Sequence, residues 1–151
     1  MSKFHWLKDL QEYLDAHDNN LISVNESIMD YNVTAYIEQR QCPGFSEKLF
    51  YFVDSKSLND TEVYKRAGLD RKLFSKIRSN PAYQPQKKTA FVLCISLQLS
   101  LDESKSLLCS AGYTFSNSHL LDLIVQYCIE HEIYNLYEVN FALNQYGLEP
   151  I

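Results

Sequence analysis

Glycine and proline are both scarce in this sequence, with four of each among 151 residues. So few residues that break regular structure predict continuous helices or strands joined by short turns. Loops that cradle phosphates and nucleophile elbows need glycines at close, fixed spacings, and no Walker loop, GxGxxG motif or GxSxG motif occurs. The sequence therefore predicts neither a nucleotide-binding loop nor a serine-hydrolase elbow.

Long apolar runs are also missing. No run approaches the ~20 residues that a membrane-spanning helix needs. The N-terminal stretch interrupts its apolar positions with charges, whereas a secretory signal has an uninterrupted apolar stretch and a cleavage site. We therefore expect a cytoplasmic protein with no membrane contact.

Residues suited to metal binding or catalysis are few and scattered. None of the cysteines forms a CxxC pair, and no HExxH or HxxxH pair occurs among the histidines. Three cysteines lie in apolar helical runs, which favours small buried side chains in a reducing compartment. We expect no metal, no cofactor, no catalytic residues and no enzyme activity. The residues concerned are Cys42, Cys94, Cys109, Cys128, His5, His17, His119 and His131.

The residues that are present favour a globular chain, with 46% hydrophobic and 22% charged residues. Apolar residues recur at intervals of three and four from Phe4 to Leu14, which is typical of an amphipathic helix over 3–16. Ser23 and Glu26 form a candidate capping box for a second helix that ends near residue 39. Together with the segments that follow, this pattern predicts an all-α fold. The further predicted helices span 45–58, 60–67, 70–79, 86–98, 102–111, 118–131 and 136–146.

Cys42, Pro43 and Gly44 form the clearest break in the chain. We therefore predict three parts: an N-terminal helical extension (1–44), a central helical domain (45–115) and a C-terminal helical hairpin packed on that domain (116–151).

Charge is distributed unevenly along the chain. Residues 59–90 contain eight basic and three acidic residues, a net charge of +5, whereas the rest of the chain carries −10. Electrostatic screening is strong beyond about 10 Å, so a local basic island can attract an anionic polymer in spite of an acidic total. An ordinary solvated helix face is the alternative explanation.

The basic island coincides with a helix-turn-helix pattern. A short helix over 60–67, a turn containing Gly68 and a helix over 70–79 have the spacing of that motif. If Leu69, Phe74 and Ile77 face inward, helical periodicity directs a polar set outward. That set is Arg71, Lys72, Ser75, Lys76 and Ser79.

The stretch 61–80 resembles the lambda-repressor-like (Xre-type) helix-turn-helix family. The matching positions are Val63, Ala67, Gly68, Leu69, Asp70, Phe74 and Ile77. Residues 85–103 resemble the fourth helix and the start of the fifth helix of that family, so the resemblance covers about 45–112.

The resemblance implies that the helix over 70–79 enters the major groove of duplex DNA, which is ~12 Å wide and admits one helix. It places base-reading positions at Arg71, Lys72, Lys76 and Ser79. Lys87 and Lys88 fall where family members contact phosphates, at a helix N-terminus that favours anions.

Two positions depart from the family pattern. Asp60 replaces a glutamine that commonly contacts a phosphate, and it would repel one. Tyr64 replaces a small residue where the two helices cross, so it must splay the helices or turn outward.

The sequence favours a DNA-binding transcriptional regulator. The alternative is an adaptor that retains the repressor-like fold and docks an acidic protein on the basic face. Tyrosines in the C-terminal part suit either a core or an interface, for a homodimer or another protein. These are Tyr113, Tyr127, Tyr134, Tyr137 and Tyr146.

Overall fold

The computed structural model describes residues 7–10 and 29–151, which divide between two compact units, Met1–Cys42 and Pro43–Ile151. In the first unit, residues 7–10 are helical and α2 spans Met29–Arg40. Val33 and Thr34 are β-branched, yet they lie inside α2 without interrupting the helix. Most of the predicted helix over 3–16 and the candidate capping box at Ser23 and Glu26 lie outside the described residues.

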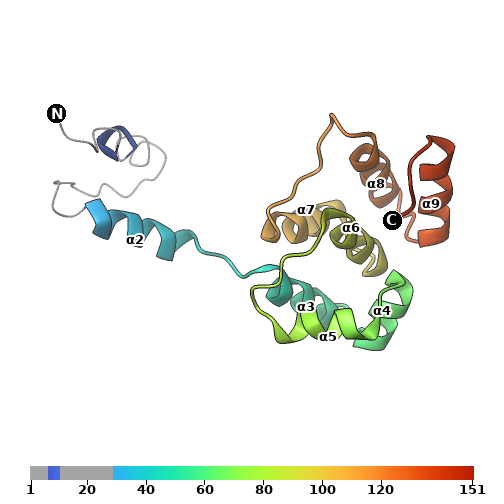
Figure 1. The fold of residues 1–151 in the computed structure, drawn as a ribbon, viewed down its shortest axis with the longest axis horizontal. Coiled ribbons are helices and arrows are strands. Elements are labelled where there is room, and N and C mark those ends of the chain that lie inside the picture. The colour runs from blue at the N-terminus through green and yellow to red at the C-terminus, as the bar shows by residue number, and fades with distance from the viewer. Residues whose placement is uncertain (1–6, 11–28) are drawn as a thin grey trace. The chain divides into compact units, whose positions relative to one another are not determined.

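The second unit is a bundle of short helices, shown in Figure 1. All elements in the described part of the chain are helices, which confirms the all-α prediction. The predicted helices from residue 45 onward are present, with ends that differ by up to three residues. They are α3 (Phe45–Ser55), α4 (Asp60–Ala67), α5 (Arg71–Ser79), α6 (Lys87–Ser96), α7 (Leu101–Ser110), α8 (Leu120–Glu130) and α9 (Leu136–Gln145).

Side chains next to the helices set where the helices begin. Asn59 accepts a hydrogen bond from the Glu62 amide and caps α4, while Asp70 accepts one from the Lys72 amide and caps α5. Ser100 and Glu103 form a reciprocal capping box at the start of α7. The bond that the Glu62 amide donates to Asn59 is one half of a capping box.

The core is centred on α6. Every residue from Ala90 to Ser96 is buried, so this helix is enclosed on all sides. Helices α4, α7 and α9 contact it, and Figure 1 shows α6 in the middle of the bundle. Helix α4, which packs on α6, also contacts α5, so the core supports the position of α5.

No helix within residues 7–10 and 29–151 has the length and apolar character needed to cross a membrane.

Candidate nucleic-acid interface

α5 is attached to the core through one face. Phe74 and Ile77 are buried, and the Phe74 ring makes edge contacts with Phe50, at 5.4 Å between centroids. Leu69 and Leu73 are half-buried at the edge of the same cluster. Burial of two large apolar side chains on so short a helix fixes which face remains outside.

The turn before α5 is made tight by Gly68. This residue has φ +64°, a left-handed conformation that glycine adopts without steric cost, and it ends α4. Leu69 and Asp70 then complete the connection to α5. The two helices are therefore joined by a turn of only three residues.

The end of α5 is held by a serine from α3. Ser46 is 4% exposed, and its hydroxyl lies 2.8 Å from the carbonyl of Ile77 and 3.0 Å from that of Asn80. The Ile77 carbonyl would normally accept from the amide four residues later, but that residue is Pro81, which has no N–H. Ser46 supplies the donor that Pro81 lacks. The sequence analysis missed this role, although proline four residues after a helical position was the available signal.

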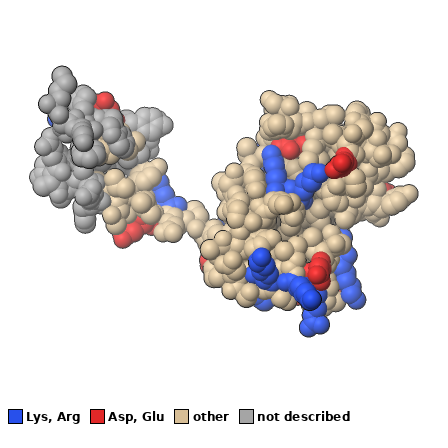
Figure 2. Space-filling model, in the orientation of Figure 1, with Lys and Arg blue, Asp and Glu red and all other residues tan. Residues whose placement is uncertain are grey.

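The outward face of α5 carries the predicted contact residues. Ser75 and Ser79 lie near the middle of this face, and their short side chains leave room for close approach of a ligand. No Asp or Glu occurs within α5. Figure 2 shows Lys and Arg side chains gathered over the part of the molecule that α4 and α5 occupy in Figure 1. All five residues predicted to contact DNA on this helix are exposed: Arg71, Lys72, Ser75, Lys76 and Ser79.

Asp60 has a basic partner from α5. Arg78 donates to both of its carboxylate oxygens, at 2.8 Å from Nε and 2.6 Å from Nη2. The guanidinium also lies over the Phe50 ring, 3.9 Å from its centroid. The hydrogen bond to Asp60 raises the pKa of Arg78. The pair is neutral in sum, so Asp60 repels an approaching phosphate less than the sequence alone implied, and Arg78 adds less to the basic face.

Tyr64 does not turn fully outward, which was one of the two arrangements expected for it. It is half-buried at the edge of the core, with its ring 5.9 Å from that of Phe74. Because the ring packs beside Phe74, its volume is accommodated within the α4–α5 pair.

Lys87 and Lys88 differ in their surroundings, although the sequence predicted one phosphate-contacting role for both. Lys88 is exposed. Lys87 is half-buried, and its ammonium pairs with the carboxylate of Asp122, which is 2% exposed. Asp122 also accepts a hydrogen bond from the Ser116 amide at 2.8 Å. The structure thus places Lys88 with the exposed basic residues and gives Lys87 a partner in α8, which helical periodicity had no means of indicating.

Comparisons with protein-family models, with curated proteins and with solved structures found no match. The family resemblance stays an interpretation of residues 45–112.

The C-terminal tyrosines, for which a core and an interface were both open, divide between two roles. Tyr113 and Tyr134 are half-buried, and their hydroxyls donate to the carbonyls of Pro85 and Leu99, both at 2.8 Å. The remaining three are exposed, at positions 127, 137 and 146. Tyr113 and Tyr134 are therefore structural residues, and only Tyr127 of α8, Tyr137 of α9 and Tyr146 just after α9 are exposed to a partner.

The cysteines do not all follow the burial expected of them. Cys94 and Cys128 are buried, whereas Cys42 and Cys109 are exposed. Cys109 lies on the outer side of α7, since its neighbours Leu107 and Leu108 fill the inner side. Burial raises the pKa of the Cys94 thiol to about 12. No group of three or more His, Cys, Asp or Glu side chains in the described parts of the chain could hold a metal ion.

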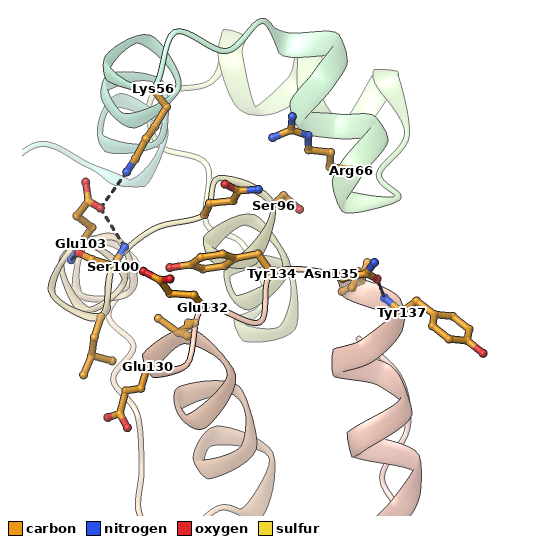
Figure 3. A pocket seen from close by; sticks show the side chains of 14 residues that line it. Lys56, Arg66, Ser96, Ser100, Glu103, Glu130, Glu132, Tyr134, Asn135 and Tyr137 are labelled. Carbon is orange, nitrogen blue, oxygen red and sulfur yellow. Dashed lines mark hydrogen bonds and ion pairs between the residues drawn. The ribbon is translucent and has the colours of Figure 1, made fainter.

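A hollow with a volume of about 1190 Å³ lies elsewhere on the second unit, and no residue of α5 lines it. Figure 3 shows Lys56 and Glu103 directed toward each other across one side of it, 3.1 Å apart, with Arg66 on another side. Its serines are engaged in the helices: Ser96 donates to the Val92 carbonyl, and Ser100 belongs to the cap of α7. The hollow therefore offers polar surface, with no hydroxyl held by a base as a nucleophile requires.

Proposed function

We propose that this chain binds duplex DNA without catalysing a reaction, as a transcriptional regulator whose α4–α5 pair is a helix-turn-helix. In this proposal α5 enters the major groove, and the lambda-repressor-like core is the domain that holds it. The observation that carries the proposal is the outward face of α5, where five exposed polar or basic side chains occur together and no acid interrupts them.

The anchoring of α5 supports this role. A helix that reads bases has to keep its side chains in register with the base edges, and loss of that register weakens specific contacts. Phe74 and Ile77 anchor the inner face, and Ser46 anchors the C-terminal end. The pairing of Asp60 with Arg78 weakens the repulsion between Asp60 and a phosphate at this face.

The residues have separable tasks in the proposal. Arg71 and Lys72, at the start of α5, contact base edges, because an arginine fork can bond O6 and N7 of guanine together. Lys76 extends this surface, and Lys88 contacts a phosphate from the start of α6. Lys87 is assigned to the internal ion pair with Asp122.

The test measures binding of the full chain to a labelled random duplex by fluorescence anisotropy over a series of salt concentrations. Changing Lys76 or Lys88 to Ala should weaken binding to all sequences and lower the salt slope by about 0.9 for each phosphate that the variant no longer neutralises. Lys105→Ala is the matched control, because Lys105 is also an exposed lysine and lies on α7. It should leave affinity and slope unchanged.

Specificity requires a selected site. At such a site Arg71→Ala should cost about 1–3 kcal/mol and relax the base preference at one position, with little effect on random DNA. A folded chain that binds no duplex even at about 50 mM salt would contradict the proposal, since non-specific binding is electrostatic and strongest at low salt. The adaptor hypothesis, with an acidic protein on the α5 face, would then account better for the basic surface.

A further inference from the structure

An apolar groove runs between α8 and α9, which lie side by side in Figure 1. Its volume is about 670 Å³. One wall is formed by Leu120, Leu123 and Tyr127, which follow one face of α8 at intervals of three and four residues. Ala142 and Tyr146 line it from α9. The exposed fractions of Leu120, Leu123 and Tyr127 are 44%, 41% and 56%, so a continuous apolar surface faces solvent.

The charges near this groove are of one sign. From Ser106 to Ile151 the sequence contains no Lys or Arg at all. Glu138 lines the groove from the first turn of α9. It lies toward the loop that joins the two helices, so the groove is apolar along its length and negative at one end.

The carboxylate of Glu138 is close to the groove wall. It contributes, after burial, to raising the pKa of the Cys128 thiol, which lines the same groove. No ion pair to Glu138 is found among the described residues. An unpaired carboxylate beside an apolar surface favours a ligand that brings a cation.

Groove-to-groove pairing with a second copy of this chain fits poorly. Pairing of two α8–α9 surfaces would bring Glu138 toward its counterpart and supply no Lys or Arg from 106–151. The basic helix α5 is no substitute, because Phe74 and Ile77 face inward and its outer face is polar. The occupant should therefore carry Lys or Arg, which residues 106–151 lack.

We propose that the groove between α8 and α9 binds an amphipathic helix of another protein, with apolar anchors along one face and Lys or Arg at the end that meets Glu138. Anchors at helical spacing in a groove between two helices are a known mode of peptide recognition. The leucines and Tyr127 bury the apolar face, and the Glu138 carboxylate sets the direction in which the helix lies. The site is independent of α5, so the DNA experiment and this one fail separately.

The probe is a labelled helical peptide of Leu and Lys, with leucine at every third or fourth position. Its controls are a peptide with Glu in place of Lys and a scrambled peptide of equal composition. We expect the full chain to bind the Leu/Lys helix and to bind both controls at least tenfold more weakly, about 1.4 kcal/mol or more in binding free energy.

Two variants locate the site. Leu123→Gln should weaken binding roughly tenfold, because it removes one apolar anchor. Glu138→Gln should weaken binding roughly threefold at low salt and less at high salt, as expected for a single screened charge. Their matched controls are Tyr51→Gln, an exposed aromatic on α3, and Glu149→Gln, an exposed acid outside the groove lining. Both controls should bind as the unchanged chain does.

Equal binding of the scrambled or the Glu peptide would overturn the proposal, as would a loss from Glu149→Gln that equals the loss from Glu138→Gln. Sedimentation supplies a further measurement. A dimer of the unchanged chain that Leu123→Gln dissociates would assign the groove to a second copy instead. Circular dichroism verifies that each variant remains helical, and Glu138→Gln, a surface change, keeps the test decisive if Leu123→Gln does not fold.

Discussion

Replacing Ser46 with alanine isolates the contact that holds the end of α5. The change removes one oxygen and adds no bulk. Ser46 has a single hydroxyl proton, and the carbonyls of Ile77 and Asn80 lie 2.8 and 3.0 Å from its oxygen. The Asn80 carbonyl also accepts from the Tyr83 amide at 3.0 Å. The Ile77 carbonyl is therefore the group that the substitution leaves without a donor.

The expected loss of stability follows from the unpaired Ile77 carbonyl. A buried acceptor that loses its only donor costs about 1–3 kcal/mol in the free energy of unfolding. A urea m-value of roughly 2 kcal/mol per molar would convert a loss of about 2 kcal/mol into a decrease of about 1 M in the urea midpoint. Because the loosened end of α5 carries Lys76 and Ser79, we also expect weaker specific DNA binding in this variant.

The assay is urea unfolding followed by circular dichroism, with Ser96→Ala as the matched control. Ser96 is equally buried, and its hydroxyl donates to the Val92 carbonyl four residues earlier, at 2.7 Å. That carbonyl belongs to the continuous α6 helix, whose backbone already supplies a donor. Loss of the Ser96 hydroxyl should therefore lower the free energy of unfolding by less than about 1 kcal/mol. Equal midpoints for the two variants would refute the assignment of Ser46 as the substitute for the missing proline N–H.

Three further predictions concern other contacts. Lys87→Ala should lower the free energy of unfolding by about 2–4 kcal/mol, because it strands a buried carboxylate, whereas Lys88→Ala should leave it within about 0.5 kcal/mol; thermal melts compare the two. The pKa of Glu103 is lowered, first by the backbone N–H at the start of α7 and then by a lysine of α3, so its stabilisation is complete above the unfolded pKa near 4.3 and is lost as pH falls through the lower folded value. The stability deficit of Glu103→Gln at pH 7 should therefore shrink toward pH 3 in acid melts. With iodoacetamide at pH 8, Cys109 should be alkylated quickly and Cys94 only on unfolding, because burial raises the pKa of Cys94 to about 12; mass spectrometry of timed samples decides this.

Local features of the sequence were sufficient to predict the helices from residue 45 onward, with ends within three residues of those observed. Asn59, Gly68 and Asp70 each act within four residues of their own position, so the α4–α5 turn could be predicted from them. The exposed face of α5 also followed from helical periodicity, because Phe74 and Ile77 fix its inner side.

Contacts between distant residues could not be read in the same way. Arg78 pairs with Asp60 from 18 positions away, Ser46 reaches Ile77 across 31 and Lys87 reaches Asp122 across 35. Each depends on how helices pack, which propensity and spacing do not specify. These contacts changed the interpretation of individual charges: two basic residues counted in the island are paired with acids, Arg78 at the surface and Lys87 half-buried.

Asp122 also determines whether the C-terminal hairpin can be separated from the rest of the second unit. The sequence suggested a boundary after residue 115, yet this carboxylate receives Ser116 and Lys87 together and so joins the loop, α6 and α8. A chain cut at residue 115 would leave the Lys87 ammonium beside the Phe91 ring, 5.6 Å from its centroid, without its counter-ion. Recombination that replaced the hairpin would need an acid at the same place. The hairpin of α8 and α9 and the helices around α6 are in that sense one structural unit.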